Sequence, residues 1–458
     1  MVAQASSART FIVLGSAAAT VITALLLHPF TAAEKAAITT TGDDGMLVTA
    51  RLTSSHILRG AHDQNLAVTI TAPAGNKMSR PPVSLAVVID RSGSMDGEPM
   101  ENAKAAAARL VSKLDAGDAF SIVTYSSGDE TVTPMVRATD ANKSAAMAAI
   151  AMIDDDGGTC ISCGLTRGAN ELNRSPVIGG VQRIVLISDG QANEGIYDRD
   201  ELAKLASDTA SKGTSISTVG VGLDFDEVTM TRLADVGRGN YYFVEDTRHL
   251  DAMFAKELGG LAETVAADVR VVLTDNPGVR IEEAYGYPMT RAGDHVFVPI
   301  ADLRAGETRK VVFRVRVETV SAATLDVTTV QLGWRRVADG QQRKAQTAVR
   351  VDVTDSLQDV EESIDIKTVE AVEQVNTARA FEEASAAYDS QGADAAQQII
   401  DRRVQAIRAN KALPKASADK LQLLNAEARE DFAKAPSGGA AGSKAKKASR
   451  AKAYDLVK

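Results

Sequence analysis

The chain has 458 residues, which is too long for one small domain and suggests about three. Its apolar and charged fractions, 45% and 24%, are those of an ordinary globular protein, and only 4% of the residues are aromatic, so its cores must rely on aliphatic side chains. The net charge of −9 argues against nucleic-acid binding, because phosphate contacts need a basic surface.

Residues 1–33 have the composition of an export signal. Arg9 precedes a stretch without a charged residue over 11–27, and small residues near Ala33 suit cleavage by a signal peptidase. The length of this stretch lies between that of a signal sequence and that of a membrane anchor, so cleavage and anchoring both stay open. We therefore expect an exported protein of the periplasm, the cell envelope or the medium, held in the inner membrane if residues 1–33 are not cleaved.

Residues 44–81 alternate apolar and polar side chains, which is typical of β-strands. From 83 to 265, buried apolar strands alternate with amphipathic helices, and this pattern predicts a doubly wound, mostly parallel sheet that is covered on both faces. We expect the strands at 84–90, 119–125, 183–189, 215–221 and 241–244, and the helices at 99–114, 141–152, 161–172, 199–211, 227–236 and 250–265.

Residues 266–354 return to a period of two without helical signals, which predicts an antiparallel β-sandwich. The strands within 44–81 have no partners of their own, so we expect them to join this sandwich. The α/β domain would then be inserted in the sandwich or lie beside it, with its two ends close together.

The C-terminal part has two different compositions. Residues 356–434 carry apolar side chains at helical spacing, with breaks at Gly392 and Pro414, and should form two or three helices. Residues 435–458 are rich in Ser, Gly, Ala and Lys, which predicts a disordered basic tail. This tail would serve either as a solubilising segment or as an electrostatic contact with anionic lipid or cell wall.

Oxygen-bearing side chains follow the predicted strand ends at characteristic spacings. They are two carboxylates and three hydroxyls: Asp90, Ser92, Ser94, Thr159 and Asp189. Because ligands of such sheets bind outside the carboxyl ends of the strands, we expect these groups to meet there and to hold Mg²⁺ or Mn²⁺. The first three alone would suggest only a capping turn before a helix. The neighbouring residues 154–156, all Asp, are interpreted as a solvated acidic loop, with an indirect or ancillary role at the cation as the alternative.

The order of these motifs resembles that of a von Willebrand factor type A domain over residues 83–265. The motifs are Asp-x-Ser-x-Ser at 90–94, Gly-Gly-Thr at 157–159 and Ser-Asp-Gly at 188–190. The resemblance implies that the five residues form the metal-ion-dependent adhesion site of that family, in its cation-binding form. The strand-rich flanks are similar, more loosely, to bacterial secreted proteins and to inter-α-trypsin inhibitor heavy chains.

Cys160 and Cys163 are the only cysteines of the chain, and they directly follow Thr159. Zinc is disfavoured because it needs more ligands and the five histidines are scattered. In an oxidising compartment the pair is close enough to form a disulfide. A disulfide, two packed thiols and a working redox pair stay open as interpretations.

The functional expectation is a non-enzymatic adhesion or interaction module of the cell envelope, whose cation binds an exposed Glu or Asp of a partner protein. The alternative is a structural or assembly protein of the envelope in which the metal site is incidental. A hydrolase is less favoured, because the sequence contains neither a recognisable nucleophile–His–acid set nor a nucleotide-binding glycine loop.

Overall fold

The computed structural model describes residues 38–74, 81–177, 180–189, 191–221, 225–244, 257, 263–319, 323–435 and 439–457. The expected leader at 1–33 and most of the helix expected at 250–265 lie outside the described residues. Residues 264 and 265, the end of that expected helix, instead begin a strand. Of the helices in the described ranges, none is long and apolar enough to cross a membrane.

The α/β domain contains a six-stranded sheet in the order β10-β9-β8-β5-β6-β7. Its strands are β5 (Val83–Asp90), β6 (Ala119–Tyr125), β7 (Asp129–Arg137), β8 (Val181–Ser188), β9 (Thr214–Val221) and β10 (Arg238–Val244). Its helices are α2 (Glu98–Ser112), α3 (Asp140–Ala151), α4 (Ile161–Leu172), α5 (Arg199–Ser211) and α6 (Glu227–Val236). The side chains of α2 and α3 pack on one face of the sheet and those of α4, α5 and α6 on the other, which confirms the predicted doubly wound fold.

One strand of this sheet was not predicted. β7 pairs antiparallel with β6 and forms the edge of an otherwise parallel sheet. Pro134 interrupts its sequence and argues against a strand, but an edge strand tolerates proline because one side of its backbone needs no partner.

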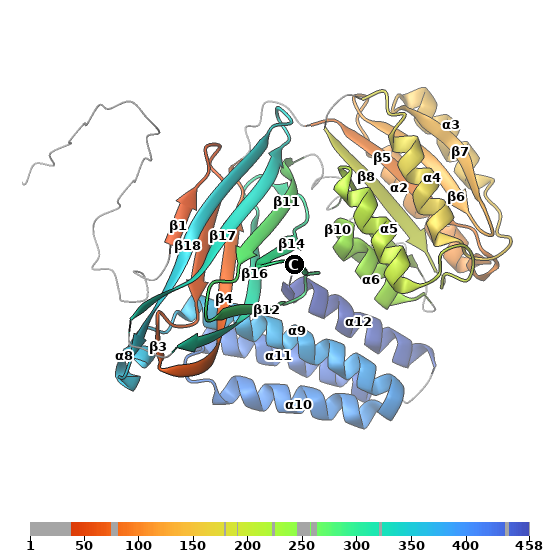
Figure 1. Cartoon of the computed structure of the whole chain (residues 1–458). Helices are drawn as coiled ribbons and strands as arrows, with labels where there is room; N and C mark the ends of the chain where they lie inside the picture. Colours follow the sequence, from red (N-terminus) through yellow and green to blue (C-terminus); the bar gives the residue numbers. More distant parts are fainter. Residues whose placement is uncertain are drawn as a thin grey trace, which may run out of the picture.

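Two sheets form the β-sandwich, one with the order β1-β2-β4-β16-β12 and the other with the order β13-β14-β11-β17-β18-β3 (Figure 1). The strands before the α/β domain are β1 (Ile38–Thr41), β2 (Leu47–Leu52), β3 (His56–Leu58) and β4 (Gly60–Thr71). Those after it are β11 (Thr264–Thr274), β12 (Val279–Ala284), β13 (Thr290–Ala292), β14 (His295–Pro299), β15 (Leu303–Arg304, paired with β11), β16 (Thr308–Thr319), β17 (Thr324–Arg336) and β18 (Gln342–Thr354).

The N-terminal strands belong to the same sandwich as the strands that follow the α/β domain. β4 pairs antiparallel with β16 along its whole length of 12 residues, and both sheets contribute to one hydrophobic core. The α/β domain is therefore an insertion between β4 and β11, as the alternation in residues 44–81 predicts.

A buried ionic network joins the α/β domain to the sandwich. Arg183 of β8 lies 3.3 Å from Glu257 and 3.6 Å from Asp302 of the sandwich, and all three side chains are at most 9% exposed. Burial acts to raise the pKa of Glu257, but the Arg183 guanidinium and hydrogen bonds from neighbouring side chains outweigh it and lower the pKa below its ordinary value. Charged contacts that are largely buried thus link the two domains.

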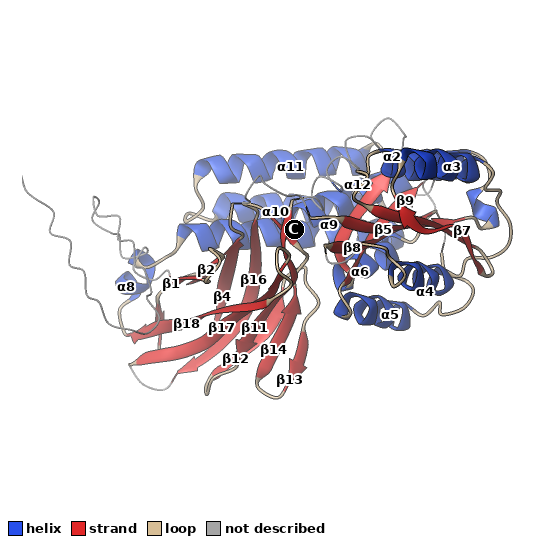
Figure 2. Ribbon diagram, turned by 90° about the horizontal axis from the view of Figure 1, so that it is seen from above, coloured by secondary structure: helices blue, strands red, loops and turns tan. Residues whose placement is uncertain are grey.

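The helices that follow the sandwich are α8 (Leu357–Glu362), α9 (Ile366–Gln391), α10 (Ala393–Ala409) and α11 (Lys415–Ala433). The predicted breaks are correct: Gly392, with φ of 87°, separates α9 from α10, and Pro414 precedes α11. The sequence predicts two or three helices here, and the short α8 makes a fourth. α9 packs through Ala371 and Val375 against Tyr285 and Val312 of the sandwich. The helices thus form a layer along one side of the sandwich (Figure 2).

The prediction of a disordered tail at 435–458 is wrong for the described residues 439–457. They contain the helix α12 (Ala440–Val457), which lies between α9 and the α/β domain. Its many Ala and Lys residues are strong helix formers. Gly442 permits close packing, because a Cβ at this position would come within 2.3 Å of the Tyr388 hydroxyl.

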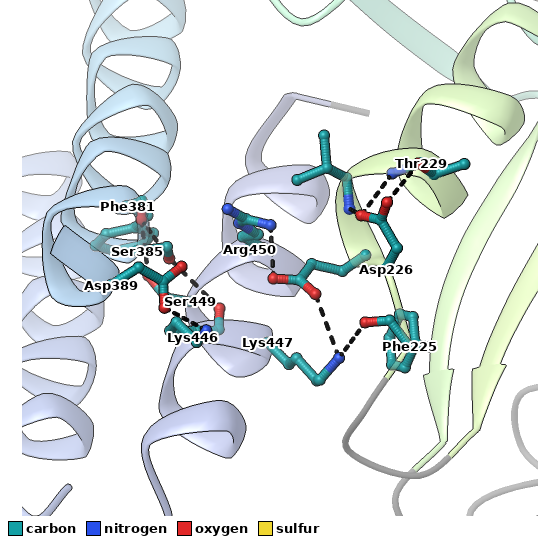
Figure 3. A network of polar contacts seen from close by, with 12 residues as sticks. Phe225, Asp226, Thr229, Phe381, Ser385, Asp389, Lys446, Lys447, Ser449 and Arg450 are labelled. Carbon is teal, nitrogen blue, oxygen red and sulfur yellow. Dashed lines mark hydrogen bonds and ion pairs between the residues drawn. The ribbon is translucent and has the colours of Figure 1, made fainter. Parts of the chain in front are cut away.

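Lys447 and Arg450 of α12 bind partners on the α/β domain (Figure 3). Lys447 is only 2% exposed; its Nζ lies 3.4 Å from the centroid of the Phe225 ring and donates to the Phe225 carbonyl at 2.9 Å. Glu227 accepts from both Lys447 at 3.3 Å and Arg450 at 2.6 Å. Composition alone cannot reveal this order, because these partners of Lys447 and Arg450 lie more than two hundred residues earlier in the sequence.

Candidate functional site

The two predicted carboxylates lie at the same edge of the α/β sheet. β5 and β8 are neighbouring parallel strands, with Ile89 opposite Ile187. Asp90 ends β5 and Asp189 directly follows β8, so both side chains emerge at the carboxyl ends of adjacent strands. This is the position that the sequence pattern predicts.

Hydrogen bonds connect these carboxylates through the two serines of the first motif. The Ser92 backbone N–H donates to Asp90 Oδ1 at 2.9 Å. The hydroxyls of Ser92 and Ser94 are 3.2 Å apart, and the Ser94 hydroxyl donates to Asp189 Oδ1 at 3.1 Å. Four of the five predicted residues therefore form one continuous polar cluster.

Thr159, the fifth residue, is brought to this edge by contacts between loops. The Gly93 N–H donates to the Gly157 carbonyl at 3.0 Å, and the Asp156 N–H donates to the Arg91 carbonyl at 2.7 Å. These bonds hold the loop before α4 against the Asp-x-Ser-x-Ser turn. Asp156 is exposed, as the interpretation of 154–156 as a solvated acidic loop requires.

The cluster lies below the surface, and one of its members is accessible. Asp90, Ser92, Thr159 and Asp189 are between 0% and 4% exposed, whereas Ser94 is exposed. Burial raises the pKa of Asp90 above its ordinary value, and hydrogen bonds from Ser188, Ser92 and Tyr125 only partly oppose this effect. A bound cation would supply the missing stabilisation of the carboxylate.

Two side chains that orient Asp90 were missed by the sequence reasoning. Ser188 donates to Asp90 Oδ2 at 2.6 Å, and the Tyr125 hydroxyl donates to the same oxygen at 3.2 Å. Their positions could have indicated this role: Ser188 precedes Asp189 in the sequence, and Tyr125 ends β6 directly opposite Asp90 in the sheet. Together they fix the carboxylate before any ligand binds.

Asn193 is a further residue without a predicted role. Its side-chain oxygen accepts from the Thr159 N–H at 2.7 Å, and the backbone N–H groups of Asn193 and Glu194 donate to the Thr159 carbonyl at 3.1 and 3.3 Å. Three hydrogen bonds thus tie Thr159 to the loop that begins with Asp189.

Cys160 and Cys163 are joined in a disulfide, which is one of the interpretations that the sequence leaves open. Cys160 is the N-cap residue of α4, and the bridge therefore closes the first turn of that helix. Cys160 is 1% exposed and Cys163 is half-buried.

The donor set has the chemistry of a hard-cation site. Within the described part of the chain, no three His, Cys, Asp or Glu side chains gather as metal ligands. The edge instead offers two carboxylates and three neutral hydroxyls, and oxygen ligands of this kind suit Mg²⁺ or Mn²⁺. Such a cation would keep part of its positive charge and its capacity for another oxygen ligand.

This protein thus contains a doubly wound α/β domain with polar side chains at the carboxyl ends of its strands, which is where α/β domains of this kind bind their ligands. Residues 84–256 match the family model of the von Willebrand factor type A domain, so this part of the chain is such a domain. The expected resemblance is thereby confirmed at the level of the domain.

Several curated relatives match part of the chain. The uncharacterized protein YfbK of Escherichia coli (strain K12) is 31% identical over 214 residues, which is 46% of this chain and 37% of that protein. Inter-alpha-trypsin inhibitor heavy chain H1 of Sus scrofa is 30% identical over 145 residues, which is 30% of this chain and 16% of that protein. The chain therefore spans well under half the length of these relatives.

A solved structure resembles this protein over most of its length. The von Willebrand factor type A structure from Catenulispora acidiphila has a TM-score of 0.70 at 18% identity and covers 88% of this chain and 96% of that chain. This is a likeness of fold, and it extends beyond the α/β domain.

Proposed function

We propose that this protein is a cation-dependent protein-interaction module, in which Mg²⁺ or Mn²⁺ binds an acidic side chain of a partner. The residues that would hold the ion are Asp90, Ser92, Ser94, Thr159 and Asp189. The observation that carries the proposal is the polar cluster at the sheet edge, which runs from buried Asp90 through the two serines to Asp189 and reaches the surface at Ser94.

The composition of the cluster supports binding instead of catalysis. Mg²⁺ prefers six oxygen ligands, and three of the five side chains are neutral hydroxyls. The charge of the ion would therefore be incompletely compensated, and a carboxylate from a partner would be attracted to it. Hydroxyl ligands also polarise bound water less than a set rich in His or carboxylates, so we propose no enzymatic role.

The match of residues 84–256 to the von Willebrand factor type A domain supports the same proposal. The uncharged stretch at 11–27 supports export to the periplasm or the cell envelope.

Cation binding is tested by isothermal titration of the whole protein with Mn²⁺ or Mg²⁺. Ser94→Ala is the informative variant, because Ser94 is exposed and its loss should leave the fold intact; we expect at least a tenfold weaker affinity. Asp156→Asn is the matched control, since it removes an exposed carboxylate of the adjacent loop and should bind as the wild type does. Equal affinity of Ser94→Ala and wild type would contradict the proposed site.

The partner is tested separately, by binding to envelope proteins with Mg²⁺, with EDTA and with Thr159→Ala. The proposal expects binding in the first condition and its loss in the other two. Binding that survives both chelation and Thr159→Ala would favour the alternative, a structural or assembly protein with an incidental metal site.

A further inference from the structure

The disulfide lies where the two loops that carry Thr159 and Asp189 press against each other. Cys160 directly follows Thr159, and its N–H donates to the Ser126 carbonyl at 2.8 Å. From the other side comes Gly195, which has φ of 64°; a Cβ there would come within 2.4 Å of Cys160 Sγ. No larger residue fits between this sulfur and the loop after β8.

The segment closed by the disulfide also receives a hydrogen bond from that loop. The Ile196 N–H donates to the hydroxyl of Ser162, which lies between the two cysteines, at 3.0 Å. Together with the bonds between Thr159 and Asn193, this contact joins the first turn of α4 to the segment that starts at Asp189. A movement of that turn would therefore shift Thr159 relative to Asp189.

The first turn of α4 has no side-chain cap. Cys160 occupies the N-cap position, and its side chain makes no capping hydrogen bond with a backbone N–H of the helix. In α3, α5 and α6 the N-cap residues Thr139, Asp198 and Asp226 do accept such bonds. A helix start without a cap tends to fray, because its N–H groups lack partners. In α4 the covalent link between Cys160 and Cys163 holds the turn in place of a cap.

We infer that the Cys160–Cys163 disulfide positions Thr159 in the metal site, so that the cation affinity of this edge depends on the oxidation state of the pair. The inference rests on the proposed function, since the ligand is the same cation. Reduction would release the first turn of α4 and loosen Thr159, while Asp90, Ser92, Ser94 and Asp189 keep their places at the strand ends.

The chemistry is a two-electron thiol–disulfide exchange with a dithiol reductant. A reductant thiolate attacks Sγ of Cys163, which is half-buried and therefore more accessible than the buried sulfur of Cys160. The S–S bond breaks, Cys160 leaves as a thiolate and takes up a proton, and a mixed disulfide forms at Cys163. The second thiol of the reductant then displaces Cys163, which is also protonated, and the reductant ends as its own disulfide.

The test measures Mn²⁺ affinity of the full chain in its oxidised form, after reduction with dithiothreitol and removal of the reductant, and after reoxidation. We expect the affinity to fall about two- to thirty-fold on reduction, the range that corresponds to the loss of a helix cap, and to return on reoxidation. Circular dichroism and thermal unfolding report whether the fold persists. A purely structural disulfide would lower the unfolding temperature and leave the Mn²⁺ affinity of the folded protein unchanged.

A matched pair of variants separates positioning from stability. Cys160→Ala/Cys163→Ala removes both the bridge and any cap, and should bind Mn²⁺ as weakly as the reduced wild type. Cys160→Ser/Cys163→Ala also lacks the bridge but places a capping hydroxyl at the N-cap, and should recover part of the affinity. Mn²⁺ binding that is equal in oxidised and reduced wild type would overturn this inference alone, whereas no binding in either state would overturn the proposed function. If the variants fail to fold, the comparison of oxidised and reduced wild type still shows whether the Mn²⁺ affinity depends on the disulfide.

Discussion

Lys447 should determine whether α12 stays on the α/β domain. The change Lys447→Ala removes a hydrogen bond from an ammonium group to the Phe225 carbonyl, a desolvated contact with the Phe225 ring and one of the two cations on Glu227. A hydrogen bond to a charged group contributes about 1.5–3 kcal/mol, and a desolvated cation–π contact about 2 kcal/mol. In the variant, Arg450 still binds Glu227, so the change leaves no unpaired carboxylate.

These contributions are not additive, and we expect Lys447→Ala to destabilise the docked position of α12 by about 3 kcal/mol. The matched control is Lys446→Ala in the same helix turn. The Lys446 side chain pairs with Asp389, which is 51% exposed, and an exposed pair of this kind contributes less than about 1 kcal/mol.

The measurement is hydrogen exchange of the α12 amides. Lys447→Ala should accelerate exchange roughly a hundredfold and Lys446→Ala by less than about fivefold. Because Lys447 is buried, added salt should change the first effect little. Equal exchange rates in the two variants would refute the reasoning, since α12 would then be held by something other than the buried ammonium.

Two further predictions concern the sandwich and its junction with the α/β domain. Leu66→Ala in β4 removes a fully buried side chain opposite Phe313 of β16. It should lower the free energy of unfolding, measured in urea, by about 2–5 kcal/mol. The control Leu47→Ala, at a position 38% exposed, should change this free energy by less than about 1 kcal/mol. Glu257→Gln should lower stability by about 3 kcal/mol at pH 7. The folded-state pKa of Glu257 lies below its ordinary value of 4.5. The ionised carboxylate therefore stabilises the fold above pH 4.5, and this stabilisation is lost as the pH falls further. The free energies of unfolding of the variant and the wild type should therefore become more similar in acid. A constant gap between their unfolding curves from pH 7 down to pH 3 would contradict this assignment.

The parts of the site that could be predicted are those set by strand ends. Asp90 and Asp189 follow apolar runs that can only be buried parallel strands, and the carboxyl ends of such strands share one edge. The groups that orient them could not be derived in the same way. Tyr125 reaches Asp90 only because β6 is the neighbour of β5 in the sheet, and strand order is not contained in the local pattern.

The errors have the same physical origin. The sequence of α12 is compatible with a soluble tail, and what orders it is packing against α9 and a buried lysine whose partners Phe225 and Glu227 lie in another domain. β7 was missed because Pro134 is unfavourable in a central strand, and only its edge position makes it acceptable. The local sequence preference did not determine the structure of α12 or of β7; in both cases the neighbouring elements in the folded protein did.

The insertion of the α/β domain has a consequence for how the chain is made. Thr71 of β4 pairs with Thr308 of β16, which is 237 residues further on. At a synthesis rate of about 5–20 residues per second, β4 waits roughly 10 to 50 s for this partner. During that interval the edge of β4 that will pair with β16 is available to other strands or to chaperones, while the α/β domain, whose sheet is built only from strands of its own segment, can already fold. Its folding brings the two ends of the insertion together, and so shortens the search that closes the sandwich.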